Sequence, residues 1–131
     1  ILAEDCNCAI IYGTKTGVEL CAKGIPVIVA GEAWIRNKGI SIDVENIESY
    51  DKIINALPKN FNISKSKILR AKKYAYHFFF RRMIPINFIE KDTTSFKPYK
   101  FNFNELEELN RNEGFETIMQ GIINNKPFVY K

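Results

Sequence analysis

Apolar residues in the first part of the chain form two short runs, separated by a turn and a short amphipathic segment. The runs cover residues 8–12 and 26–30, contain mostly apolar and branched side chains, and are each followed by a glycine. Runs without polar alternation are typical of strands covered on both faces of a parallel sheet. Between them, a turn over 14–17 leads to a predicted helix over 18–23, with Gly24 just past its end. This order predicts a βαβ unit with a right-handed crossover.

The remainder of the chain shows mainly helical periodicity. In order, the pattern predicts extended residues 40–44, a helix over 46–57, a long helix over 64–83, extended residues 84–90, a polar linker over 91–100 and a last helix over 115–123. Asp43 or Asn46 is expected to cap the helix over 46–57, and Pro58 to end it. Asn104 opens a further helix in the pattern of a capping box, and Gly114 is expected to break it.

These elements predict an α/β protein with a partial Rossmann-like parallel sheet flanked by helices. Two strands rarely make a stable sheet, so we expect further strands to precede Ile1. The chain starts with Ile1, whereas its methionines are Met83 and Met119. We therefore expect residues 1–131 to be one domain of a longer protein whose N-terminal part is absent.

Composition and charge are those of an ordinary globular protein. Of the 131 residues, 46% are hydrophobic and 26% are charged, which excludes disordered and collagen-like classes. No apolar run approaches the ~18 residues that a membrane-spanning helix needs, and no signal peptide is visible. An odd number of cysteines (Cys6, Cys8 and Cys21) predicts a reducing, cytoplasmic location with all three buried as small apolar residues. One histidine and three cysteines do not suggest a metal site.

The most informative segment is Tyr12-Gly-Thr-Lys-Thr-Gly-Val-Glu19, which joins the carboxyl end of a predicted strand to the start of a helix. Ligands bind at this edge of open α/β sheets, and a helix N-terminus favours phosphate. The segment matches neither a Walker A loop nor a Gly-x-Gly-x-x-Gly motif. An alternative needs no ligand, because Thr16 and Glu19 have the spacing of a helix capping box.

The stretch from Tyr12 to Gly39 resembles the nucleotide-sugar half of capsular polysaccharide biosynthesis glycosyltransferases, which have the GT-B fold. The shared order is a turn rich in Ser and Thr, Gly-x-Glu, a short helix, Gly-x-Pro-Val, then Gly with an aromatic residue, and a final Gly. Residues 118–128 also resemble the end of that domain. The resemblance is good over 8–43, thinner over 104–128 and absent between them.

The resemblance implies a glycosyltransferase whose C-terminal half binds a nucleotide-sugar donor and passes the sugar to a saccharide or lipid-linked acceptor. Thr14 and Thr16 match the turn that holds the donor phosphate, and Glu19 matches an acidic residue facing the donor. Gly31 and Trp34 match the loop that borders the donor cleft, although Trp34 could equally cover the sheet edge. The predicted donor-binding set is Gly13, Thr14, Lys15, Thr16, Gly17, Glu19, Gly31 and Trp34.

One residue of the turn departs from the family pattern. Lys15 stands where the family usually has a small or hydroxyl residue, so its role in donor binding is open. In such enzymes the catalytic base and the acceptor site come largely from the other half. No catalytic residue, cofactor or metal ligand is therefore predicted here, and we expect the fragment alone to be inactive.

From Lys59 to Arg82 the sequence has eight basic residues and no acidic one, although the whole chain carries a net charge of only +4. This stretch predicts either a contact with an anionic membrane surface, at the inner face of the membrane, or an ordinary solvated helix face. Nucleic acid is not expected as a partner, because the nearby aromatics have helical spacing. Two alternatives to the enzyme remain, a non-catalytic α/β nucleotide-binding module and a peripheral-membrane domain.

Overall fold

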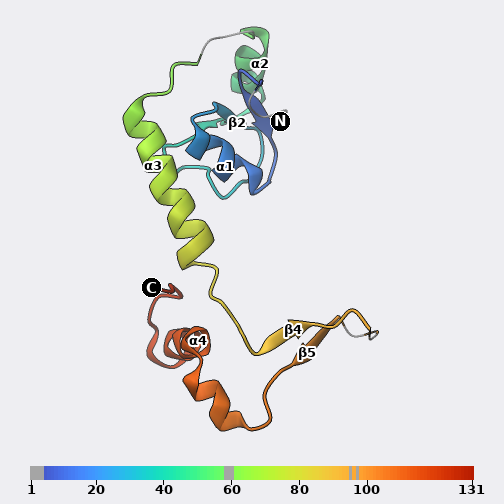
Figure 1. Ribbon diagram of the computed structural model, residues 1–131. Helices are drawn as coiled ribbons and strands as arrows, with labels where there is room; N and C mark the ends of the chain where they lie inside the picture. Colours follow the sequence, from blue (N-terminus) through green and yellow to red (C-terminus); the bar gives the residue numbers. More distant parts are fainter. Residues whose placement is uncertain (1–4, 58–60, 95, 97) are drawn as a thin grey trace. The chain divides into compact units, whose positions relative to one another are not determined.

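The structure is a computed structural model that describes residues 5–57, 61–94, 96 and 98–131 (Figure 1). The chain divides into two compact units, Ile1–Tyr76 and His77–Lys131, and each is described here by itself. The predicted helix end at Pro58 and the start of the basic stretch at Lys59 lie outside the described residues.

A three-stranded parallel sheet forms the centre of the first unit. Its strands are β1 (Ala9–Ile11), β2 (Val27–Val29) and β3 (Ile42–Asp43), in the order β1-β2-β3. Ile10 pairs with Ile28, and Ile28 pairs with Ile42. All three residues of β2 are buried, as expected for a strand covered on both faces. The predicted α/β architecture with a parallel sheet and flanking helices is confirmed, and the short extended piece after residue 40 supplies its third strand.

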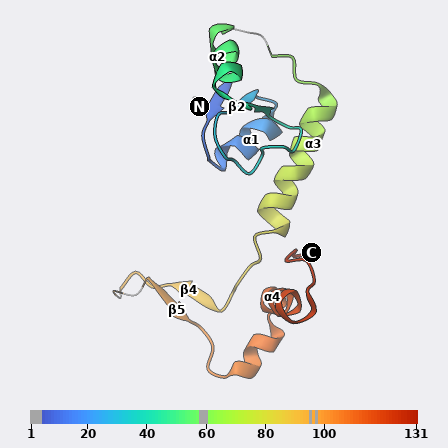
Figure 2. The ribbon, with the colours of Figure 1, turned by 180° about the vertical axis from the view of Figure 1, so that it is seen from behind.

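Helix α1 (Thr16–Lys23) lies between this sheet and helix α3 (Lys65–Tyr76) (Figure 1, Figure 2). It ends as predicted, because Gly24 adopts φ +84° and donates its N–H to the carbonyl of Cys21. A side chain at Gly24 would also come within 3.0 Å of Ile68, so the glycine allows the two helices to approach closely. Apolar burial along α1 and at Ala71 of α3 joins the helices to the sheet.

The segment after β2 is a loop that is anchored in the core. Ile35 is fully buried within it, and the loop turns through two left-handed residues, Asn37 at φ +59° and Gly39 at φ +68°. Helix α2 (Ile47–Asn55) follows β3. Asn46 caps α2 as one of the two predicted caps, accepting a hydrogen bond from the Ser49 N–H, while the Ser49 side chain accepts from the Asn46 N–H.

The described residues of the second unit form short elements and the α-helix α4. They are the π-helical turn η1 (His77–Arg81), the strands β4 (Ile89–Lys91) and β5 (Tyr99–Phe101), the 3₁₀ helix η2 (Leu106–Arg111) and α4 (Glu113–Asn124). Phe88 contacts Phe103 and Phe115 edge to face, which joins the hairpin to α4. The predicted long helix over 64–83 is observed as the α-helix α3, which is followed by the π-helical turn η1.

Three predictions in this unit are wrong. The polar linker over 91–100 contributes to an antiparallel β4–β5 hairpin, in which Lys100 pairs with Glu90 at 3.5 Å. Asn104 does not cap a helix, since η2 begins after Glu105 without a side-chain cap. Gly114 lies inside α4 rather than ending a helix, because a Cβ there would collide with the Pro85 carbonyl and only glycine fits.

The cysteines and the chain's end have simple local explanations. Cys21 is buried, and burial raises the pKa of its thiol to about 11. Cys8 is only half-buried and Cys6 is exposed, so the expectation that all three cysteines are buried holds for Cys21 alone. In the second unit, hydrogen bonds from Lys131 and Tyr130 lower the pKa of the Glu113 carboxyl and hold the C-terminal segment on α4.

Candidate functional site

A pocket of about 470 Å³ lies at the carboxyl ends of the three parallel strands. We call it the strand-end pocket. Its walls come from the residues after β1, the residues after β2, and the junction of β3 with α2: Tyr12, Ala30, Gly31, Glu32, Arg36, Val44, Glu45, Asn46, Ile47 and Tyr50. This is the edge at which open α/β sheets bind ligands. The sheet topology therefore places a pocket at the edge that the sequence predicts.

Tyr12 forms an aromatic wall of the strand-end pocket. A Cβ on Gly31 would lie 2.5 Å from Cδ2 of Tyr12, so the ring packs directly on the glycine backbone. The same residue remains 78% exposed. Gly31 does not have a positive φ, so close approach of the ring, not backbone conformation, explains the glycine. Tyr12 thus has one side supported by the protein and the remainder open to the pocket.

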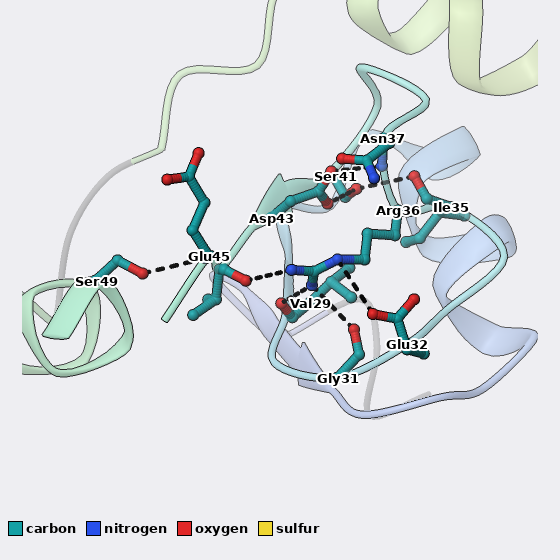
Figure 3. Close-up of polar contacts among 11 residues, drawn as sticks. Val29, Gly31, Glu32, Ile35, Arg36, Asn37, Ser41, Asp43, Glu45 and Ser49 are labelled. Carbon is teal, nitrogen blue, oxygen red and sulfur yellow. Dashed lines mark hydrogen bonds and ion pairs between the residues drawn. The ribbon is translucent and has the colours of Figure 1, made fainter. Parts of the chain in front are cut away.

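Arg36 ties the ends of β2 and β3 together (Figure 3). Its Nη1 donates to the Gly31 carbonyl at 3.0 Å and to the Val29 carbonyl at 3.4 Å, and its Nη2 donates to the Val44 carbonyl. Its Nε lies 3.6 Å from Oε1 of Glu32, whose carboxylate is otherwise 91% exposed. Because the guanidinium is committed to carbonyl oxygens and a carboxylate, it is a structural support of the pocket more than an anion receptor.

A second set of hydrogen bonds fixes the loop that carries Arg36. Asp43 accepts from the Asn37 N–H and from the Ser41 hydroxyl, both at 2.6 Å. Ser41 is also placed to donate to the Ile35 carbonyl at 3.2 Å (Figure 3). Lys67 of α3 donates to the Ser41 carbonyl at 3.0 Å. The loop is therefore held to β3 and to α3, which gives the strand-end pocket a fixed wall.

The turn over residues 13–17 differs from the predicted capping box. Thr16 is the first residue of α1, and Lys15 occupies the cap position without a side-chain hydrogen bond. Thr14 takes part of the capping role, because its hydroxyl accepts from the Thr16 N–H at 3.3 Å. The Thr14 hydroxyl also donates to Oγ1 of Thr16 at 3.2 Å. Thr16 therefore keeps its own hydroxyl proton for a different acceptor.

The two glycines of this turn are both close-packing positions. A Cβ on Gly17 would lie 2.5 Å from Cδ1 of Ile11 and 2.9 Å from Cδ1 of Ile35. A Cβ on Gly13 would lie 2.7 Å from the carbonyl oxygen of Glu32. The first contact seats α1 on the sheet. The second brings the beginning of the turn against a residue that lines the strand-end pocket, so the turn and the pocket adjoin.

The structure brings together only part of the predicted donor-binding set. Gly31 lines the strand-end pocket, and Gly13 borders it. Lys15 and Glu19 are exposed on the turn and on α1, and neither lines the pocket. Trp34 is 51% exposed, and its carbonyl accepts a hydrogen bond from the Tyr74 hydroxyl at 2.6 Å. It does not line the pocket either, and its role toward a ligand stays a prediction.

Sequence reasoning missed most of the polar and aromatic walls of the pocket. Tyr12 and Glu32 could have been predicted from the sequence, because each follows a predicted strand and so belongs to the ligand-binding edge. Arg36 and Tyr50 carry no such signal. They reach the pocket only through the path of the loop after β2 and the placement of α2, which depend on contacts between distant residues.

The part of the chain that the structure describes holds no group of three or more His, Cys, Asp or Glu side chains suited to a metal ion. Within the same residues, no helix has both the length and the apolar character needed to cross a membrane. Comparison with family models, with curated proteins and with solved structures found no match to this chain. The resemblance over residues 8–43 therefore stays a prediction.

Proposed function

We propose that the first unit is the donor-binding part of a glycosyltransferase that builds a surface polysaccharide from a nucleotide-sugar. The observation that carries the proposal is the strand-end pocket, which adjoins a turn rich in hydroxyl groups at the carboxyl edge of a parallel sheet. The stretch that resembles capsular polysaccharide glycosyltransferases, residues 8–43, supplies most of the elements around this pocket.

The turn is suited to the phosphates of such a donor. Thr14 and Thr16 are exposed at the N-terminus of α1, where the helix dipole favours negative charge. Thr16 is the stronger donor candidate, because Thr14 already donates its proton to the Thr16 hydroxyl. Lys15 is exposed between them and adds positive charge beside the phosphates. Thr16 is therefore expected to donate to the phosphate, and Thr14 to hold the Thr16 hydroxyl in place.

Titration calorimetry with UDP-glucose, GDP-mannose and CMP-N-acetylneuraminate tests the proposal. We expect one of these donors to bind and Thr16→Val to weaken binding by about 1.5–3 kcal/mol, the value of a hydrogen bond to a charged group. That is roughly a tenfold to hundredfold loss of affinity. Thr14→Val should weaken binding less and should lower stability by up to ~1 kcal/mol, because it removes the acceptor for the Thr16 N–H.

Thr93→Val is the matched control, since Thr93 is an exposed threonine of the second unit. It should leave both affinity and melting temperature unchanged. The proposal is wrong if no donor binds the unmodified chain. It is also wrong if Thr16→Val lowers the melting temperature while leaving the affinity intact, since the turn would then only begin a helix.

A second candidate function, contact with an anionic membrane surface, draws on the outer face of α3. Lys65, Leu69, Lys72, Lys73 and Tyr76 are all exposed on this helix, and no acidic residue occurs between Lys65 and Tyr76. Lysines beside exposed apolar side chains suit the interface of a negatively charged bilayer. Such a contact would place a donor site near a lipid-linked acceptor. We call these five residues the outer face of α3.

A further inference from the structure

We infer that the strand-end pocket receives the uncharged ring part of the nucleotide, its base and ribose, while the phosphates stay at the turn. This inference rests on the proposed function and assigns different parts of one ligand to neighbouring sites. The turn offers hydroxyl groups and a helix N-terminus. The strand-end pocket offers aromatic and apolar walls with carboxylate residues at its edge.

The charges lining the pocket argue against phosphate inside it. Glu32 and Glu45 both line it, and Arg36 is its one cation among the described lining residues. The Arg36 guanidinium already donates to the carbonyls of Gly31 and Val44 and faces the Glu32 carboxylate. A phosphate would have to displace these acceptors and approach two carboxylates. A neutral ring with hydroxyl groups meets neither obstacle.

The apolar surfaces of the pocket suit a flat ring. Tyr12 rests on Gly31 and leaves most of its surface exposed, and Ile47 is 79% exposed at the start of α2. Tyr50 lines the same pocket one turn further along α2. Any of the nucleotide bases can stack on an aromatic side chain, because every base has a π face. The Tyr12 ring is therefore the expected stacking platform, and its support on Gly31 keeps it in position.

Glu32 is the expected partner of the ribose hydroxyls. Its carboxylate is 91% exposed and lies 3.6 Å from Nε of Arg36, so its outward lone pairs can accept from a diol. Glu45 differs, because its carboxylate points away from the Arg36 guanidinium (Figure 3). The two acidic residues of the pocket thus differ, and the ribose contact is assigned to Glu32, which Glu32→Gln tests.

Titrations with UDP, GDP, CMP and inorganic pyrophosphate test this assignment on the whole chain. Tyr12→Ala should weaken binding of the preferred nucleotide about tenfold to a hundredfold, and Tyr12→Phe should restore it, because stacking needs the ring and not the hydroxyl. Glu32→Gln should lower the affinity for the nucleotide roughly tenfold. Neither change should alter pyrophosphate binding, whereas Thr16→Val should weaken pyrophosphate and nucleotide alike.

Tyr99→Ala and Glu48→Gln are the matched controls, since both residues are exposed and neither lines the pocket. If a nucleotide binds and needs Thr16 but is indifferent to Tyr12→Ala, the ring assignment is overturned and the proposed function stands. If Tyr12→Ala weakens pyrophosphate as much as nucleotide, the tyrosine acts through the fold and the assignment also fails. If neither nucleotide nor pyrophosphate binds, both proposals fall.

Discussion

Arg36 shows how one side chain can hold two strand ends and a pocket wall in place. It lies in a loop, yet its side chain is only 19% exposed, and its donors are distributed among carbonyls that follow β2 and β3. A planar guanidinium can serve several acceptors in fixed directions, which a single ammonium group cannot. The stability of this edge of the sheet therefore depends on the identity of the cation and not only on its charge.

Replacing Arg36 tests this role directly. We expect Arg36→Met to lower the free energy of unfolding by about 2–3 kcal/mol, because carbonyls in a partly buried site lose a charged donor. Arg36→Lys should recover only part of this loss. Urea unfolding followed by the fluorescence of Trp34, which lies in the same loop, gives the measurement. Lys38→Met removes an exposed cation from that loop and should change little, and equal destabilisation by the two methionine variants would contradict the assigned role.

Among the elements, α3 combines a buried and an exposed face with different consequences. Its inner face packs on α1, with Ala71 buried, while the outer face of α3 carries three of its lysines. The basic stretch runs from Lys59 to Arg82 in the sequence, and within α3 its exposed lysines Lys65, Lys72 and Lys73 share one helix face. Lys67 is excluded from that face, because it bonds to the Ser41 carbonyl.

Vesicle binding tests the outer face of α3. Replacing Lys65, Lys72 and Lys73 together by Gln should weaken binding to vesicles with phosphatidylserine by about 3 kcal/mol, at ~1 kcal/mol for each lysine near the surface. The matched control replaces Lys23, Lys38 and Lys52 by Gln, which gives the same change in net charge at exposed positions elsewhere in this unit. Equal loss in both triple variants would mean that only net charge matters. Absence of binding by the unmodified chain would leave an ordinary solvated helix.

The elements that sequence patterns predicted well are those whose determinants are local. The apolar runs of β1 and β2 and the glycine that ends α1 are read within a few residues. Residues 84–90 were expected to be extended, which overlaps β4, but its pairing with β5 was not predicted. Both strands are only three residues long and exposed along their length, so they lack the burial pattern that marks a strand. Gly114 was misassigned because its reason is a long-range contact with the Pro85 carbonyl.

The candidate site also has one part that the sequence predicts and another that only the three-dimensional structure shows. The ligand-binding edge and the turn after β1 follow from the order strand, turn and helix, which the sequence displays. The exchange of capping roles between Thr14 and Thr16 depends on hydroxyl geometry within the turn. The seating of Tyr12 on Gly31 depends on the spacing of two neighbouring strands. Neither can be deduced from residue types alone.

At the scale of the whole molecule, the residues of the proposed donor site all belong to the unit Ile1–Tyr76. Hydrogen exchange measured with and without a bound donor should therefore show protection in peptides covering 12–17 and 30–50. Peptides from His77–Lys131 should exchange at unchanged rates, because none of the site residues comes from that unit. A pocket of about 190 Å³ in that unit, lined by Glu113 and Tyr130 among others, offers the counter-test, since protection there would place the donor elsewhere.

We expect the 131-residue chain to bind the donor without transferring its sugar. Sugar transfer needs a group that removes the acceptor proton or stabilises the departing phosphate, held within reach of the reacting atoms. In the strand-end pocket, the Glu32 carboxylate is paired with Arg36, and the Glu45 carboxylate points away from the guanidinium (Figure 3). Among the described residues that line the pocket there is no histidine. We therefore expect the bound donor to remain intact when its nucleotide release is followed by NMR in the presence of simple sugars. Release of nucleotide above the rate in buffer, lost in Glu45→Gln while the donor still binds, would instead locate a catalytic carboxylate within this chain.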